Sequence, residues 1–297
     1  MDIKIKELLK EKRPNLSASS LKTYASILKG LYYTAFDTED FDASKFDNTK
    51  RILQVLKDVN PRTRKTYCSA LFVISDKPEY KKVMISDIEE YNDEEGKQEK
   101  TDKQEDNWVE KDDIINLFKS LEDDNKHIYK KKNISNSDFQ HLQNYIILAL
   151  LGGIYIPPRR SKDFVDFKIK NINPEEDNYL KGDKLYYNSY KTAKTYGLQV
   201  VEIPKELSKI LKRWIKLNPT EYLLFDSNQN KLSNVKLNQR LNKLFGKKAG
   251  INQMRKTYLT TKFGETSKQI EEMKKTMKEM GSSISQERIY IKHDKSI

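Results

Sequence analysis

The sequence predicts a mainly α-helical protein of two domains with one small β-hairpin. Apolar residues recur at helical spacing along most of the chain, and strand-type composition is confined to residues 185–203. An acidic stretch at 87–106 separates the two helical regions. A chain of 297 residues is long enough to bury two cores. We therefore expect a helical domain at 1–86, a linker at 87–107 and a second domain at 108–297.

The charge balance indicates a polyanionic partner. The chain has 56 lysines and arginines against 44 acidic residues, a net charge of +12, together with 17 tyrosines and 11 phenylalanines. Basic residues interleaved with aromatic ones are typical of nucleic-acid binding. A lysine-rich protein without such a partner is the alternative that composition alone leaves open.

Cysteine usage and hydropathy predict an intracellular protein with no membrane role. Cys68 is the only cysteine, so no intrachain disulfide can form, and its apolar surroundings indicate a core position. The longest apolar run, Tyr145–Leu151, is too short to span a bilayer. The first residues lack the apolar region of a signal peptide.

Two helix starts organise the first domain. Ser17 can cap a helix with Leu21, Tyr24 and Leu28 on its apolar face, and Asn60-Pro61 starts another. The polar side of the second helix supplies the DNA-binding candidates Arg62, Arg64 and Lys65. A plain helical bundle would show the same pattern.

The stretch from Asp87 to Asp106 predicts a linker. Its 20 residues contain ten acidic side chains and three lysines, a local charge of −7. Such a composition buries too little apolar surface to fold alone, and it repels phosphate. We expect it to run outside any bound DNA.

The second domain begins at Trp108 and contains the predicted hairpin. A helix with Ile114, Phe118 and Leu121 on one face follows Trp108, and an apolar helix ends before Pro157-Pro158-Arg159-Arg160. Residues 185–192 and 198–203 have strand composition on either side of a turn at 193–197. A later helix presents Arg240 to a DNA backbone.

The segment Gly250–Thr261 predicts a phosphate-binding helix. Asn252 is a good N-cap, and Met254, Tyr258 and Leu259 follow at helical spacing. Arg255 then falls in the first turn, where backbone N–H groups and the helix dipole favour an anion.

These residues resemble the tyrosine recombinases (phage integrase family). The family's first motif is an arginine followed three residues later by Glu or Asp, which Arg160 and Asp163 match, with Arg159 as the alternative arginine. Its second motif is His-x-x-Arg followed by His or Lys, which matches Asn252, Arg255 and Lys256, with asparagine in place of the histidine. A tyrosine nucleophile follows some 30 to 40 residues later in the family, and Tyr290 fits that place.

The resemblance also implies the fold and the roles of the site residues. It assigns residues 1–86 to a core-binding domain that clasps DNA and residues 108–297 to the catalytic domain. A lysine at the hairpin turn enters the minor groove in the family; Lys191 fits best and Lys194 is the second choice. Tyr290 would form a 3′-phosphotyrosine link, Arg160 and Arg255 would hold the phosphate oxygens, and Lys191 would protonate the leaving 5′ oxygen.

The sequence departs from the family in two places. Asn252 can donate a hydrogen bond but cannot shuttle a proton. The family's His or Trp nine residues before the tyrosine is Gly281 here, or Ser282 if one residue is deleted. The histidines are scattered (His127, His141 and His293), so we expect no metal and no cofactor.

The resemblance implies double-stranded DNA as partner and a homotetramer on two duplexes. We expect a monomer in free solution. Seven residues follow Tyr290, so an exchanged element would use the preceding stripe of Ile270, Met273, Met277 and Met280, although packing against the catalytic core is the favoured interpretation of that stripe.

The motifs Pro157-Pro158-Arg159-Arg160 and Asn107-Trp108-Val109 are similar to recombinases of large DNA viruses and mobile elements. A type IB topoisomerase and an inactive DNA-binding protein of the same fold are the alternatives.

Overall fold

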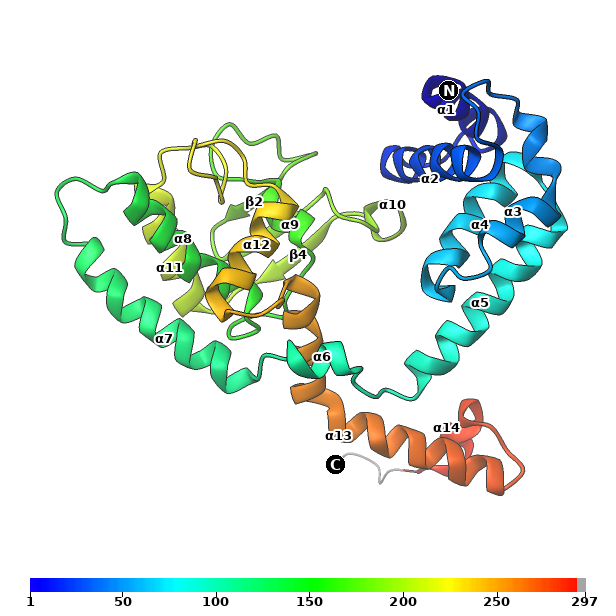
Figure 1. Cartoon of the computed structure of the whole chain (residues 1–297). Helices are drawn as coiled ribbons and strands as arrows, with labels where there is room; N and C mark the ends of the chain where they lie inside the picture. The colour runs from blue at the N-terminus through cyan, green and yellow to red at the C-terminus, as the bar shows by residue number, and fades with distance from the viewer. Residues whose placement is uncertain (293–297) are drawn as a thin grey trace. The chain divides into compact units, whose positions relative to one another are not determined.

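The computed structural model describes residues 1–292 and contains two compact units, Met1–Lys100 and Thr101–Ile297 (Figure 1). The first unit is entirely helical. Its elements are α1 (Asp2–Lys12), α2 (Ala18–Phe36), the 3-10 helix η1 (Ala43–Asp47), α3 (Thr49–Val55), α4 (Pro61–Ser75) and α5 (Pro78–Gly96).

The predicted helix starts of the first unit are confirmed. The Ser17 side chain accepts from the backbone N–H of Ser20, and Asn60 caps α4 with Pro61 at its first position. The core contains Leu28, Tyr32 and Leu71, and it also buries Cys68 as predicted. Burial raises the pKa of the Cys68 thiol to about 11, so the thiol is held in its unreactive protonated form.

The prediction of a linker at 87–107 is wrong for its first half. Helix α5 continues to Gly96, and Asp87 is only 1% exposed. Its carboxylate accepts from Nε and Nη2 of Arg64 at 3.0 and 2.6 Å. A short helix, α6 (Asp102–Asp106), follows, so within 87–107 only residues 97–101 and Asn107 are not helical. The acidic stretch folds because the basic face of α4 supplies the countercharges that composition alone cannot locate.

The three cations predicted to bind DNA from this unit all face α5. Arg62 pairs with Glu94 and Glu95 at 3.0 and 3.3 Å, and the ammonium of Lys65 lies 3.3 Å from the centroid of the Tyr91 ring. The helix α5 thus covers and partly neutralises the basic side of α4. Their role in DNA binding stays a prediction.

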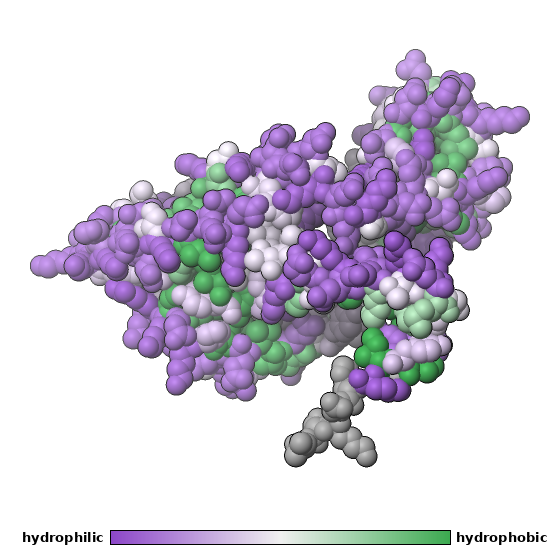
Figure 2. Space-filling model, turned by 90° about the horizontal axis from the view of Figure 1, so that it is seen from below, coloured by the Kyte–Doolittle hydropathy of each residue, from purple (hydrophilic) through white to green (hydrophobic). Residues whose placement is uncertain are grey.

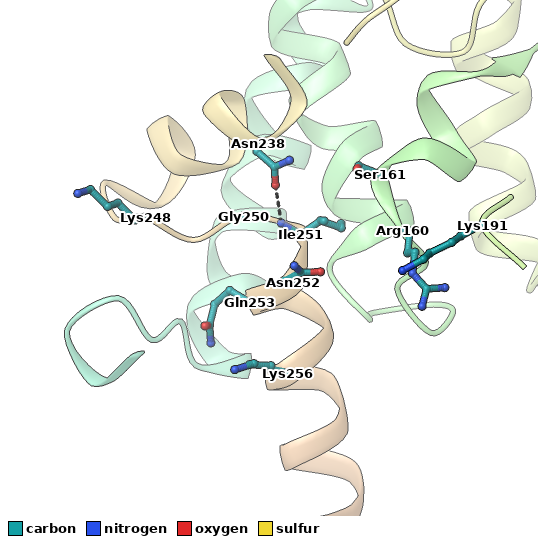
Figure 3. A pocket seen from close by; sticks show the side chains of 10 residues that line it. All are labelled: Arg160, Ser161, Lys191, Asn238, Lys248, Gly250, Ile251, Asn252, Gln253 and Lys256. Atoms are coloured by element: carbon teal, nitrogen blue, oxygen red, sulfur yellow. Dashed lines mark hydrogen bonds between the residues drawn. The ribbon is translucent and has the colours of Figure 1, made fainter. Parts of the chain in front are cut away.

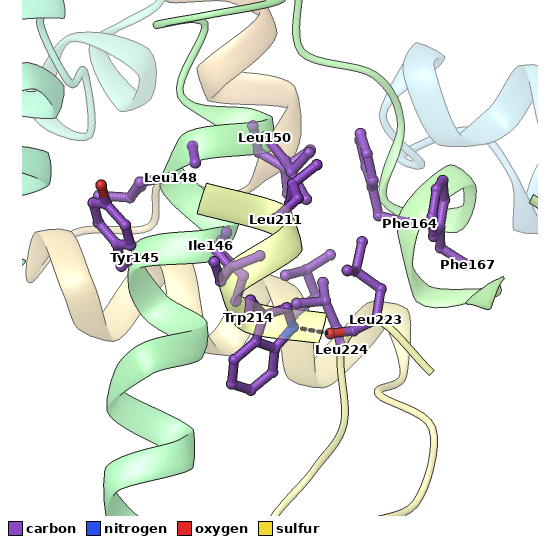
Figure 4. Packing of buried hydrophobic residues seen from close by; sticks show 14 of the residues in the cluster. Tyr145, Ile146, Leu148, Leu150, Phe164, Phe167, Leu211, Trp214, Leu223 and Leu224 are labelled. Atoms are coloured by element: carbon purple, nitrogen blue, oxygen red, sulfur yellow. Dashed lines mark hydrogen bonds between the residues drawn. The ribbon is translucent and has the colours of Figure 1, made fainter. Parts of the chain in front are cut away.

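The second unit surrounds one buried helix. Its helices are α6, α7 (Lys111–Ile128), α8 (Asn136–Leu151), α9 (Ser161–Val165), α10 (Ala193–Tyr196), α11 (Lys205–Leu217), α12 (Asn234–Phe245), α13 (Ile251–Glu279), the 3-10 helix η2 (Ile284–Gln286) and α14 (Glu287–Tyr290). Helix α8 is buried along its apolar length from Tyr145 to Leu151. Beside it the Trp214 ring stacks on Phe225 and donates to the carbonyl of Leu223 at 2.8 Å (Figure 4).

A four-stranded sheet lies at one side of this core. Its order is β1 (Phe167–Lys168), β2 (Asn178–Lys181), β3 (Lys184–Tyr187) and β4 (Gln199–Glu202), with β1 parallel to β2 and the other pairs antiparallel. The predicted hairpin is confirmed as β3 and β4, with Tyr186 opposite Val200. Strands β1 and β2 were not predicted, because two to four residues are too few to show an alternation.

Helix α13 begins in the core and ends outside it. Its first part packs on α7 and α8, while η2 and α14 lie beside its C-terminal part (Figure 1). The stripe that was expected to pack on the catalytic core does not do so: Met277 is buried, but Ile270 and Met280 are exposed. Apolar residues gather on the surface next to the C-terminus, among them Ile289 and Ile291 (Figure 2).

The buried ion pair between α4 and α5 gives a stability prediction. Replacing Asp87 with alanine leaves the partly buried Arg64 guanidinium without its carboxylate, so we expect a loss of about 2 to 3 kcal/mol in the free energy of unfolding. Urea unfolding of the full chain measures this. Asp93→Ala on the exposed side of α5 is the control and should change the value by less than about 0.5 kcal/mol. Equal effects of the two variants would contradict the role given to the pair.

Candidate functional site

A cavity of about 520 Å³ lies within the second unit, where three distant parts of the chain meet (Figure 3). Four cations line it, and none of its lining residues is acidic. The lining residues are Arg160, Ser161, Lys191, Asn238, Lys248, Gly250, Ile251, Asn252, Gln253 and Lys256. The cavity therefore offers positive charge and hydrogen-bond donors to an anion.

The N-terminus of α13 forms one wall of this cavity. Gly250, and not the predicted Asn252, occupies the N-cap position. The Asn238 side chain on α12 takes over the capping, because its Oδ1 accepts from the backbone N–H of Ile251 at 2.9 Å. A Cβ on Gly250 would lie 2.5 Å from that oxygen, so this close approach requires glycine. The first backbone N–H groups and the helix dipole add to the positive field of the cavity.

Asn252 and Lys256 line the cavity, whereas Arg255 stands beside it. Asn252 is the second residue of α13 and is exposed, so its amide is available to a ligand. Arg255 is the fifth residue, just beyond the predicted first turn, and is half-buried. Burial raises the pKa of the Asp163 carboxyl, and the charge of Arg255 is one of those that oppose this rise.

Asp163 is a buried carboxylate that is not part of the cavity lining. It is 3% exposed, and its Oδ2 accepts from Nε of Arg159 at 2.8 Å. Burial raises the pKa of Asp163, and Arg159, Arg160 and Arg255 oppose that rise. One carboxylate thus lies near all three arginines that the sequence motifs contain.

The two adjacent arginines have different surroundings. Arg160 is exposed and lines the cavity from the N-terminus of α9. Arg159 instead donates to Asp163 and to Oε1 of Gln199, and its Cζ lies 4.0 Å from the centroid of the Tyr187 ring. Protein groups thus occupy the guanidinium of Arg159. Its surroundings therefore do not favour the DNA contact that was predicted for it.

Of the two lysines of the hairpin loop, Lys191 lines the cavity. Lys194 is exposed on the short helix α10 and does not line it. The loop carrying Lys191 closes on itself, since the Tyr190 hydroxyl donates to the carbonyl of Gly197 at 2.7 Å. The two lysines thus differ in their place relative to the cavity, and the catalytic role of Lys191 stays a prediction.

Arg240 is recessed rather than presented to solvent as predicted. It donates to Oε1 of Gln140, and burial lowers the pKa of its guanidinium. It lines a second cavity of about 520 Å³, with His141 and Lys243 among the neighbours. Helix periodicity places Arg240 on a face of α12, but only the position of α8 reveals that this face is covered.

Tyr290 is not brought to the cavity. It lies on α14, is 56% exposed and is absent from the cavity lining. The last residues of the chain, 293–297, with His293 among them, lie outside the described residues. Of the predicted site residues, the cavity therefore brings together Arg160, Lys191, Asn252 and Lys256, whereas Arg255 and Tyr290 are absent from its lining.

The cavity wall is fastened to the start of the second unit. The Thr257 hydroxyl donates to the carbonyl of Val109 at 2.6 Å, and the Lys247 ammonium donates to the carbonyl of Trp108 at 3.0 Å. The backbone N–H of Lys248 donates to Oδ1 of Asn107 at 2.8 Å. The segment that enters the unit thus holds the loop that carries Lys248.

Asn238 is the site residue that sequence reasoning missed. It caps a helix that starts 13 residues later, and no local spacing signals such a contact. Over residues 1–292, no group of three His, Cys, Asp or Glu side chains is arranged to hold a metal ion. None of the helices within the same range is both long and apolar enough to cross a membrane.

Comparison with protein-family models and with curated proteins gives no match. Among solved structures, the chain is similar to XerA recombinase, with 13% identity over 88% of this chain and 84% of that one and a TM-score of 0.36. It is similar to a lambda integrase dimer bound to a COC′ core site, with 12% identity over 88% of both chains and a TM-score of 0.46. It is also similar to XerH site-specific recombinase bound to palindromic difH substrate, with 13% identity over 89% of this chain and 74% of that one and a TM-score of 0.45. The chemistry that the cavity can support depends on its own side chains and not on these structural similarities.

Proposed function

We propose that this protein is a tyrosine recombinase that cuts and rejoins double-stranded DNA through a 3′-phosphotyrosine intermediate. The observation that supports this most is the cavity in which Arg160, Lys191 and Lys256 meet the N-terminus of α13 with no acidic residue in the lining. A phosphodiester is the ligand that suits such a site, because it is anionic and its charge increases in the transition state.

Each group has a defined part in the proposed reaction. The Tyr290 oxygen attacks phosphorus and loses its proton to solvent, while the bond from phosphorus to the 5′ oxygen breaks. Arg160 and Arg255 hold the two nonbridging oxygens with planar forks of donors. The ammonium of Lys191 gives its proton to the departing 5′ oxygen. The reverse reaction with a different 5′ hydroxyl joins the new strand.

The proposal requires Tyr290 to approach the cavity. Helix α13 has 29 residues and is therefore about 43 Å long. The segment from Met280 to Tyr290 reaches only about 36 to 40 Å when fully extended. Because the cavity-lining Lys256 lies about 35 Å from the end of α13, Tyr290 reaches the cavity of the same chain only if η2 and α14 unfold and the segment extends almost fully. We propose that α13 bends at Gly264, where nothing surrounds the missing Cβ, when DNA is bound.

We propose that the protein is DNA-associated inside the cell and forms a homo-oligomer only on DNA. The exposed apolar residues of α13 and α14, Phe263, Ile270 and Ile289, support this, because pairing of two copies would bury them. Sedimentation should show a monomer without DNA and a larger species with a cognate duplex. A stable tetramer at micromolar concentration in DNA-free buffer would refute the DNA-dependent assembly.

The central experiment looks for the covalent intermediate. The protein is incubated with a nicked suicide duplex made from the DNA that flanks its own coding region, and adducts are resolved on a denaturing gel. We expect an adduct with the wild-type chain, none with Tyr290→Phe, and formation slowed by about 10²-fold or more with Arg160→Ala.

Three other results would change the assignment. An adduct that survives in Tyr290→Phe would identify a different nucleophile. Relaxation of supercoiled plasmid without recombinant product would favour a topoisomerase. Salt-dependent DNA binding with no adduct on any duplex would leave a DNA-binding protein without catalysis.

The bend in α13 gives a separate prediction. Gly264→Ala adds a Cβ that meets nothing within 4 Å and strengthens the helix by about 1 kcal/mol. We expect slower adduct formation with unchanged affinity for the duplex. The control is Thr261→Ala, one turn earlier at an exposed position, which also raises helix propensity. Equal rates for wild type and Gly264→Ala would contradict a bend at this residue and favour a tyrosine supplied by a second copy.

A further inference from the structure

Asn178 is a fully buried polar residue that the proposed reaction does not use. It is the first residue of β2 and is 0% exposed. Its side-chain amide donates to the carbonyl of Asp163 at 3.0 Å and to the carbonyl of Ser189 at 2.8 Å. Its Oδ1 accepts from the backbone N–H of Ser189 at 2.8 Å. Both donors and the acceptor of this side chain are thus used on main-chain groups.

These hydrogen bonds join two of the elements that form the cavity. Asp163 lies on α9, three residues after Arg160, and Ser189 lies two residues before Lys191. Arg160 and Lys191 themselves approach the cavity from separate segments (Figure 3). The separation between the two side chains therefore depends on how the Lys191 loop is held against α9.

The two joined elements differ in how firmly they are anchored. Helix α9 is held by Phe164 and Val165, which are buried in the core. The loop beyond Tyr190 is exposed at Tyr196 and Leu198, although Tyr190 itself is buried and its hydroxyl donates to Gly197. The loop is consequently the element that moves when the Asn178 hydrogen bonds are lost.

Arg159 reinforces the same connection from the other end of the loop. Its guanidinium binds Asp163 on α9 and Gln199 at the start of β4, and it lies 5.2 Å from the centroid of the Tyr190 ring. The hydrogen bonds of Asn178 and Arg159 therefore fasten both ends of the loop to α9. The Asn178 contacts are the hydrogen bonds that hold the N-terminal end of the loop to α9.

We propose that Asn178 is a positioning residue that places the Lys191 ammonium opposite Arg160. The proton donor and the phosphate-binding group can then contact the same phosphodiester. The role of Lys191 as proton donor rests on the function proposed above. The placement of the loop by Asn178 does not, and it can be measured without DNA.

The test compares Asn178→Ala with a matched control, Asn218→Ala. Asn218 is also a buried asparagine of this unit, and its amide donates to the carbonyls of Tyr222 and Leu223 at 2.9 and 3.3 Å. It does not line the cavity. Thermal unfolding of both variants shows whether they lose stability to a similar extent, which separates a local effect from general weakening.

The first readout is the exposure of the loop to trypsin. Cleavage after Lys191 and Lys194 should be about tenfold or more faster in Asn178→Ala than in wild type, because the loop opens more often. Asn218→Ala should match wild type at these two bonds. Equal cleavage in Asn178→Ala and wild type would overturn the proposal.

The second readout uses the leaving group. On a suicide duplex with the natural 5′ oxygen, Asn178→Ala should form adduct on the order of 10²-fold more slowly than wild type, the cost of a misplaced catalytic group. On the same duplex with sulfur at the bridging 5′ position, its rate should return to within about threefold of wild type. A thiol has a pKa near 8.5, far below that of an alcohol, so a thiolate leaves without a proton donor. Lys191→Ala should show the same recovery.

The possible failures are distinguishable. Equal slowing of Asn178→Ala on both duplexes would mean general damage or a displaced Arg160 and would overturn the proposal. No adduct with wild type on either duplex would refute the proposed function, while the trypsin comparison would still decide whether Asn178 holds the loop. If Asn178→Ala does not fold, Asn178→Asp, which keeps the acceptor for Ser189 and loses both donors, replaces it with the same expected results.

Discussion

One buried carboxylate, that of Asp163, binds the arginine next to the cavity-lining Arg160. Asp163 is almost fully buried, yet its charge is offset by Arg159, Arg160 and Arg255. Without it, the half-buried Arg159 guanidinium would lose its carboxylate partner. Only Arg159 binds it directly, which leaves Arg160 exposed to the cavity. The carboxylate is therefore close to the cavity without being part of its lining.

The cavity is built from segments that are far apart in the chain, and side-chain amides connect them. Asn238 joins α12 to the first N–H of α13, and Asn178 joins α9 to the loop of Lys191. An amide suits this purpose because it offers donors and an acceptor and carries no charge that would neutralise the lysines. The site is thus positioned by neutral groups around a single buried acid.

The acidic stretch has a different effect from the one its composition suggests. Half of it is the end of α5, where Asp87 and Glu94 face the arginines of α4. The positive charge of the first unit is consequently reduced on the face that the sequence had marked as basic. The cavity of the second unit has no such acidic lining, so there the positive charge stays available to a ligand.

The sequence by itself predicted the longer helices α2, α4, α7, α8, α12 and α13, the hairpin, and three of the cations that line the cavity, Arg160, Lys191 and Lys256. Caps such as Ser17 and Asn60, and motifs such as Arg160 with Asp163, depend on neighbours within a few residues, so spacing is enough to recognise them. The capping of α13 by Asn238, the covering of Arg240 by α8 and the pairing of Arg64 with Asp87 depend on residues 13 to 100 positions away. Only the tertiary structure decided these contacts, and it also left Tyr290 outside the cavity. The physical reason is that periodicity defines which face of an element is polar, whereas the charge or cap that meets this face is set by how separate elements pack.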